Sequence, residues 1–197
     1  INLDSYENDI IDKLKSVKPI SCPNLDQFSN IDTHVIAKLD DAKLACKIYG
    51  EKLNYNTHLH ENFIEGDVND LANYFSNYLK DCEKGLHIWG GESSVQLPEN
   101  PGRGGRNQQL ALLLAEKIKN SDVIFLSAGT DGTDGPTNDA GGLVDRTTIE
   151  LGNSLDLDCA EFLKKADSGN YLEKVKALVT TGPTGTNVMD LVLAIKL

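Results

Sequence analysis

Positive charge is what this sequence most clearly lacks. The 197-residue chain has 19 lysines and arginines against 30 aspartates and glutamates, which gives a formal net charge of −11 at pH 7. Binding a nucleic-acid backbone or an anionic membrane surface requires a basic field. We therefore expect neither a nucleic acid nor a membrane as a partner.

Long apolar runs and paired cysteines are missing as well. No run reaches the ~18 apolar residues of a membrane span, and no signal peptide opens the chain. The four cysteines include no C-x-x-C pair, so their spacing gives neither a zinc site nor a disulfide framework. This favours reduced thiols in a cytoplasmic protein. The first residue is Ile1 rather than Met, and we therefore expect a piece of a longer protein.

The two common nucleotide-binding fingerprints are absent. The run G-R-G-G-R-N at 102–107 lacks the third glycine of G-x-G-x-x-G, and G-x-x-x-x-G-K-[ST] occurs nowhere. A dehydrogenase of the usual kind and a P-loop kinase are both disfavoured.

The sequence does contain an alternation of strand and helix patterns, which indicates an α/β fold. We expect a three-layer α/β/α arrangement with a mixed sheet, in a domain spanning 31–197 and preceded by a helix and linker at 1–30. The helix would begin at Asp4 or Ser5 and end before Pro19. Strands are predicted at 33–39, 57–64, 86–89, 93–97, 122–128, 177–180 and 188–197. Helices are predicted from Asp40 or Asp41, from Asp67, and at 107–119, 145–151, 158–165 and 168–175. The helix from Asp40 or Asp41 would turn Ala42, Leu44, Ala45, Ile48 and Tyr49 inward.

Two glycine-rich loops are the most informative stretches. Gly90–Asn107 holds Arg103 and Arg106, two of only three arginines in the chain, and Ser127–Gly142 holds three aspartates. An arginine presents a planar, permanently charged fork that suits a carboxylate or phosphate. Arg106 would lie at a helix N-terminus, whose amides favour an anion. We therefore expect the two loops to face each other across an anion site.

Each candidate residue also has a structural interpretation. The two arginines could instead bridge acidic loops of the same domain. Asp131 and Asp134 could orient a substrate hydroxyl or hold Mg²⁺, or they could be turn residues. Glu92 could be an arginine partner at a strand end. Thr184, Thr186 and Asn187 could donate to a phosphate or serve turn chemistry. Outside these loops, His58 and His60 are expected at the surface, and Trp89 and Met189 in the core.

Four motifs together resemble the C-terminal MOFRL region of glycerate 2-kinases, a class whose relatives were once labelled hydroxypyruvate reductases. They are G-G-E-S-S (90–94), G-R-G-G-R-N-Q-Q (102–109), S-A-G-T-D-G-T-D-G-P-T (127–137) and T-G-P-T-G-T-N-V-M-D-L (181–191). The resemblance implies ATP-dependent phosphorylation of D-glycerate, with Mg²⁺, in a cleft between two α/β domains.

The resemblance also implies roles for particular residues. Arg106 would face the glycerate carboxylate or the transferred phosphoryl group, and Asp131 the substrate hydroxyl. Arg103, Asn107 and Asp134 match neighbouring motif positions. The family's preceding N-terminal domain, with its glycine-rich turn and active-site lysine, is not in this chain. The chain would therefore be the substrate-side portion of the kinase, inactive or nearly so alone.

Two other functions stay open at this point. One is a hydroxypyruvate reductase-type oxidoreductase, which needs a dinucleotide site that the sequence does not show. The other is a non-catalytic anion-binding module that uses the same loops without turnover.

Overall fold

The computed structural model describes residues 12–13, 15–17, 30–32 and 34–197. The chain divides into two units, Ile1–Ile36 and Ala37–Leu197, and the second holds the fold described below. Of the predicted first helix, residues 12, 13, 15 and 16 are helical, and the rest lies outside the described residues. The predicted domain boundary near residue 30 stays a prediction.

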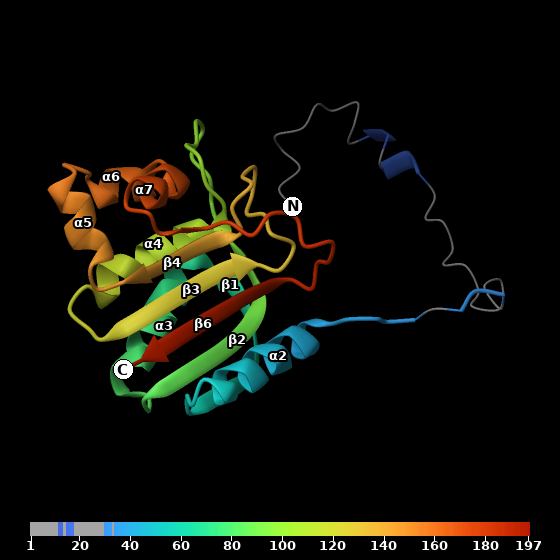
Figure 1. Ribbon diagram of the computed structural model, residues 1–197. Helices are drawn as coiled ribbons and strands as arrows, with labels where there is room; N and C mark the ends of the chain where they lie inside the picture. The colour runs from blue at the N-terminus through green and yellow to red at the C-terminus, as the bar shows by residue number, and fades with distance from the viewer. Residues whose placement is uncertain (1–11, 14, 18–29, 33) are drawn as a thin grey trace. The chain divides into compact units, whose positions relative to one another are not determined.

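Six strands form one mixed sheet in the order β1-β2-β6-β3-β4-β5 (Figure 1). β1 and β2 run parallel, whereas β6 lies between β2 and β3 and is antiparallel to both. The strands are β1 (Thr57–Asp67), β2 (Gly85–Ser94), β3 (Val123–Gly129), β4 (Gly141–Asp145), β5 (Leu178–Val179) and β6 (Asp190–Lys196). The last strand of the chain therefore lies inside the sheet, between β2 and β3.

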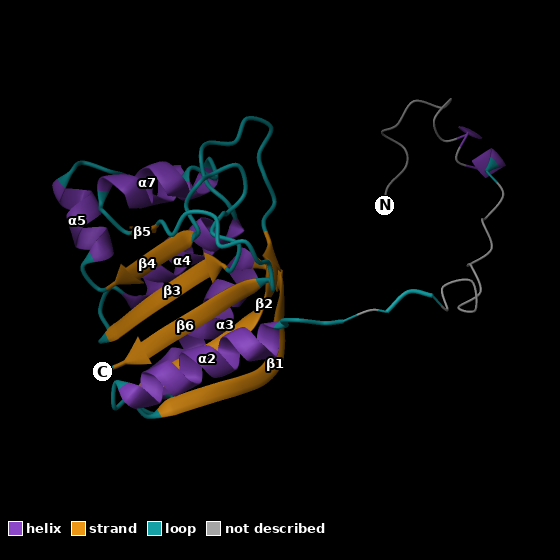
Figure 2. Ribbon diagram, turned by 45° about the vertical axis from the view of Figure 1, so that its right-hand side comes forward, coloured by secondary structure: helices purple, strands orange, loops and turns teal. Residues whose placement is uncertain are grey.

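Helices cover both faces of the sheet, which confirms the α/β class with a mixed sheet. Figure 2 shows α2 on one face and α3 and α4 on the other. The helices are α2 (Leu39–Lys52), α3 (Val68–Asp81), α4 (Arg106–Ile118), α5 (Thr148–Ser154), α6 (Cys159–Lys164) and α7 (Ser168–Lys174). Among the described residues, no helix is both long and apolar enough to cross a membrane.

The main core lies between the sheet and α3 and α4. α3 begins where the Asp67 side chain accepts from the Asn69 amide, as its sequence predicted. Its apolar residues at 3–4 spacing face the sheet, and Phe75 packs edge-on against Trp89, with ring centroids 5.1 Å apart. Trp89 is fully buried, as expected, and so is Phe125 of β3.

The predicted turn at Gly90 and Gly91 is wrong, because β2 runs straight through both glycines to Ser94. A Cβ at Gly91 would lie 1.9 Å from the Ile64 carbonyl oxygen of β1. The glycine therefore permits a close approach of two strands and not a reversal of the chain. The predicted return strand at 93–97 is likewise wrong, since 95–105 is a loop.

Two predictions near α2 are also corrected. Residues 34–38 of the predicted strand at 33–39 form no strand, and Leu39 already belongs to the helix. α2 was expected to bury Leu44, Ile48 and Tyr49, but these side chains are 46–64% exposed. The helix instead turns Gly50 toward the sheet, where a Cβ would lie 2.6 Å from Leu86. Leu39, at the start of the helix, also packs on β2, where a Cβ at Gly90 would lie 2.6 Å from its Cδ1.

The histidines of β1 are not the surface residues that the sequence suggested. His60 stacks on Trp89 with ring centroids 4.2 Å apart, and His58 stacks on the buried His87 at 4.4 Å. The Tyr78 hydroxyl lies 3.1 Å from His87 Nδ1. Cross-strand pairing of β1 with β2 creates this cluster, and pattern reading along one strand does not show it.

The helices after β4 follow the predictions with small shifts. α6 and α7 lie within the predicted spans, while α5 starts three residues later than expected. The short strand β4, which begins in the second glycine loop, was not predicted. Three of the four cysteines are described, and all three are free: Cys46, Cys82 and Cys159.

Candidate functional site

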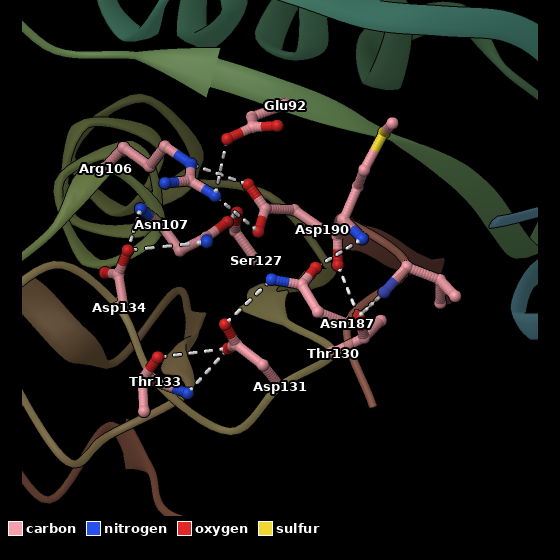
Figure 3. A network of polar contacts seen from close by, with 12 residues as sticks. Glu92, Arg106, Asn107, Ser127, Thr130, Asp131, Thr133, Asp134, Asn187 and Asp190 are labelled. Atoms are coloured by element: carbon pink, nitrogen blue, oxygen red, sulfur yellow. Dashed lines mark hydrogen bonds and ion pairs between the residues drawn. The ribbon is translucent and has the colours of Figure 1, made fainter. Parts of the chain in front are cut away.

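Three strand ends bring the glycine loops together. β2 and β3 end at the edge of the sheet where the antiparallel β6 begins. Asp190, the first residue of β6, pairs with Gly91 of β2 on one side and with Gly129 of β3 on the other. The end of β2, the loop after β3 and the start of β6 therefore share one site (Figure 3).

Arg106 is the cation at the centre of this site. It opens α4 and donates from Nε to Asp190 Oδ2 over 2.8 Å and from Nη2 to Asp190 Oδ1 over 3.1 Å. Glu92, at the end of β2, lies 3.3 Å from Nη2. The Asp190 side chain is 5% exposed, whereas that of Arg106 is 30% exposed and that of Glu92 53% exposed. Both the expected helix-start position of Arg106 and the expected pairing of Glu92 with an arginine are confirmed.

The N-terminus of α4 is not open to a substrate anion, contrary to our expectation. The carboxylate of Asp134 accepts from the amides of Asn107 and Gln108, at 3.0 and 2.8 Å. Asp134 is 2% exposed, and a Cβ at Gly105 would overlap it. The second loop thus caps the helix that the first loop begins, and the protein's own carboxylate takes the anion position.

Burial raises the pKa of Asp134 to about 6, although the amides of Gln108 and Asn107 act in the opposite direction. A buried carboxylate is harder to ionise because it loses its hydration. Asn107 also lies in the interior, where its side-chain oxygen accepts from the Ser127 hydroxyl over 2.6 Å. Asp134 and Asn107 thus hold the two loops together, while their expected place among the substrate-binding residues stays a prediction.

Asp131 is partly exposed and lies in the loop after β3. Its Oδ1 accepts from the Thr133 amide over 2.9 Å, which is an Asx-type turn, and its Oδ2 accepts from Asn187 over 3.1 Å (Figure 3). The turn interpretation of this residue is therefore correct. One carboxylate oxygen, Oδ2, has a single protein donor, and the partial exposure leaves it within reach of a ligand.

The third loop, residues 180–189, packs directly on the second. Thr184, which is exposed, donates its hydroxyl to the Thr130 carbonyl over 2.6 Å, and its amide donates to the Asp131 carbonyl over 3.2 Å. Its turn chemistry is confirmed. Met189 is 41% exposed and has φ 73°, so its predicted place in the core is wrong.

Arg103 pairs with other carboxylates than Arg106 does. Its Nη2 donates to Asp139 over 2.5 Å and its Nη1 to Glu173 over 2.8 Å, while its amide donates to Asp167 over 2.7 Å. The arginine thus joins the first loop to α7 and to the second loop. For Arg103 the bridging role is the one that the contacts support.

Asp190 is the residue that sequence reasoning missed. It stood inside the fourth motif and near the start of the strand predicted at 188–197, and an aspartate there, beside a glycine-containing loop, was the available signal. Its partner lies 84 residues away in the chain, so only the folded sheet pairs it with Arg106.

The described residues contain no group of three or more histidine, cysteine, aspartate or glutamate side chains arranged to hold a metal. Mg²⁺ often takes only one or two protein carboxylates and completes its shell with water and phosphate oxygens. Asp131 is the carboxylate here that fits such a partial role. Both loop arginines already pair with carboxylates, so within the described part of the chain they provide little charge for a triphosphate.

Comparison with known proteins adds to this geometry. Residues 85–190 match the family described as the MOFRL family. The chain belongs to the MOFRL family. This match includes β2, α4, β3 and both glycine loops, and it ends at Asp190.

Individual relatives extend the similarity to most of the chain. It is 35% identical to the D-glycerate 2-kinase of Thermotoga maritima, covering 85% of this chain and 42% of that protein. It is 36% identical to human glycerate kinase, covering 83% of this chain and 32% of that protein. The crystal structure of glycerate kinase from Thermotoga maritima superposes with a TM-score of 0.80 at 34% identity, over 86% of this chain and 43% of that one. The chain thus spans less than half the length of these relatives.

Proposed function

We propose that this chain is the C-terminal, substrate-side portion of a glycerate 2-kinase, which phosphorylates D-glycerate with ATP. The observation that carries the proposal is the convergence of Arg106 and Asp131 on one sheet edge, in a chain whose relatives are named glycerate kinases. Phosphoryl transfer is catalysed mainly by positioning and electrostatic stabilisation, so a fixed arginine beside an accessible carboxylate suits it.

In this proposal Arg106 and Asp131 contact the substrate. The Nη1 of Arg106 takes the glycerate carboxylate or the transferred phosphoryl group, because Nε and Nη2 already serve Asp190. Asp131 Oδ2 orients the hydroxyl that attacks the phosphorus and accepts its proton. Glu92 limits the positive field at Arg106, and Thr184 shapes the loop that carries Asp131.

The cations that meet the triphosphate come from outside this chain. Arg106 is balanced by Asp190 and Glu92, so the described site has no surplus of positive charge. We therefore propose a covalently attached, preceding α/β domain that supplies a lysine and the ATP site. Mg²⁺ would supply charge neutralisation at the phosphates, with Asp131 as the contribution of this chain. The cytoplasmic location expected from the cysteines stays part of the proposal.

The test is ADP formation by the full-length protein with D-glycerate, ATP and Mg²⁺. We expect turnover in the full-length protein and, for the 197-residue chain alone, no more than trace activity. Absence of ADP formation by the full-length protein would refute the kinase assignment. A parallel assay with hydroxypyruvate and NADH examines the reductase alternative, which predicts loss of reduced cofactor. Titration of the short chain with glycerate examines the anion-binding alternative, which predicts binding without turnover.

A further inference from the structure

The four-residue turn 187–190 contacts both residues that we assign to the substrate. At one end, Asn187 Nδ2 donates to Asp131 Oδ2 over 3.1 Å. At the other end, Asp190 accepts two hydrogen bonds from Arg106. Only Val188 and Met189 separate the two contacts, so a shift of this turn moves both partners together (Figure 3).

The turn is held in a conformation that an unconstrained chain rarely adopts. Met189 has φ 73°, in the left-handed region that disfavours residues with a Cβ. Its amide donates to Asn187 Oδ1 over 3.0 Å, and its carbonyl accepts from the Thr130 amide and hydroxyl at 3.0 and 2.7 Å. Backbone strain of this kind persists where the surroundings fix it, and it gathers at functional sites.

The absence of a side chain at Gly129 leaves room for the carboxylates of Asp131 and Asp190 to approach the same backbone position. A Cβ at this position would lie 3.0 Å from Asp131 Oδ1 and 3.5 Å from Asp190 Oδ1. It would also lie 2.6 Å from the Thr133 carbonyl oxygen. The glycine therefore lets the end of β3, the Asp131 loop and the start of β6 approach one another closely.

We propose that Asp190 is a positioning residue that aims Arg106 at the substrate, within a turn that also sets Asp131. This inference rests on the proposed function. Asp190 binds Nε and Nη2 of the guanidinium in a two-point contact, which fixes the plane of the group and leaves Nη1 for another partner. Among the described residues, Nη1 of Arg106 has no hydrogen-bond partner. Asp190 itself is nearly buried and acts through Arg106.

A double-mutant cycle in the full-length protein tests the coupling. The variants are Asp190→Asn, Arg106→Ala, the double variant, and Asp122→Asn as a matched control. Asp122 pairs with Arg146 in an exposed ion pair near the opposite end of β3. We expect Asp190→Asn to lower kcat/KM for glycerate by about 10-fold or more, and to change it less than about 2-fold once Arg106 is alanine. Asp122→Asn should match the wild type. An equal loss from Asp190→Asn in both backgrounds would overturn the proposal, since the residue would then act independently of Arg106.

A second variant and a measurement without turnover separate positioning from general structure. Asp190→Glu keeps the charge but moves the carboxylate by one methylene, so we expect lower kcat/KM with a melting temperature near that of the wild type. Arginine-specific ¹⁵N NMR should show a slowly exchanging Arg106 Nε–H, assigned by its loss in Arg106→Lys and lost as well in Asp190→Asn. Full activity in Asp190→Glu, or an Nε–H that survives Asp190→Asn, would refute the positioning role. If the wild type shows the protected Nε–H but phosphorylates no glycerate, the proposed function fails while the Arg106–Asp190 geometry stands.

Discussion

Arg106 and Asp190 lie 84 residues apart in the chain and form a two-point ion pair where β6 begins, with N–O distances of 2.8 and 3.1 Å. This pair reduces the charge that Arg106 can offer to a ligand. An arginine in a glycine loop suggests an open anion site, but here its charge is matched by Asp190 and approached by Glu92. An anionic substrate can bind strongly at this edge only when further cations arrive from elsewhere, such as from the preceding domain that we propose.

Replacement of Arg106 tests its assignment to the substrate. In the full-length protein we expect Arg106→Ala to lower kcat/KM for glycerate by about 100-fold or more, through loss of a charge-assisted contact in the transition state. Arg146→Ala removes an exposed arginine in the turn after β4 and is the control. Steady-state kinetics measure both. Turnover near the wild-type level in Arg106→Ala would show that the arginine does not serve the reaction.

The raised pKa of Asp134 predicts a pH dependence of stability. Because the folded state keeps its proton up to about pH 6 and the unfolded state releases it near pH 4, stability decreases as the pH rises between these values. The loss should amount to about 3 kcal/mol in the free energy of unfolding. Asp134→Asn removes the titration. Urea unfolding of both proteins from pH 4 to 7 should give curves that diverge across this window, and parallel curves would contradict the shift.

The lowered pKa of His60 predicts the opposite pH dependence, in which stability decreases as the pH falls. Burial, with the nearby charges of His87, His58 and Lys43, lowers the pKa of His60 to about 4, while Tyr78 contacts it from α3. Below pH 6.5 this histidine is protonated in the unfolded chain but stays neutral in the folded chain. Stability is therefore lost as the pH falls toward 4.

The variant His60→Phe keeps a ring on Trp89 and removes this titration. Its free energy of unfolding should depend less on pH between 6.5 and 4 than that of the wild type. The difference in slope should correspond to the uptake of up to about one proton on unfolding. The variant His34→Gln, at an exposed position, is the control. Equal slopes for His60→Phe and the wild type would show that His60 titrates normally.

The close contact of Gly91 with β1 predicts that a larger residue at this position destabilises the protein. A Cβ at Gly91 would lie 1.9 Å from the Ile64 carbonyl oxygen, so Gly91→Ala must push β1 and β2 apart. We expect a loss of about 1–3 kcal/mol or more in the free energy of unfolding. Ser94→Ala, at an exposed position on the same strand, is the control. Thermal or chemical unfolding measures both, and an unchanged Gly91→Ala would place Gly91 in an open turn.

Predictions from the sequence were most accurate where the signal was local. α3 begins after its aspartate cap and buries the apolar residues at 3–4 spacing, because one helix face and one side chain decide both. α4 begins at Arg106, one residue before the predicted start, although its cap is the distant Asp134. The predictions failed where a partner from another part of the chain decided the outcome. Gly90 and Gly91 lie within β2 and not in a loop, and α2 packs through Gly50 while Leu44 and Ile48 face outward.

The same distinction holds for the candidate site. The sequence by itself determined the α/β class, the two glycine loops and their content of arginines and aspartates, because spacing and residue type are properties of short segments. Only the tertiary structure decided which of these charges remain available to a ligand. Asp134 became a helix cap and Arg103 a bridge, because folding brings the loop after β3 against the start of α4 and the loop before it. Asp190 became the partner of Arg106, because β6 enters the middle of the sheet and carries a distant carboxylate to the first loop.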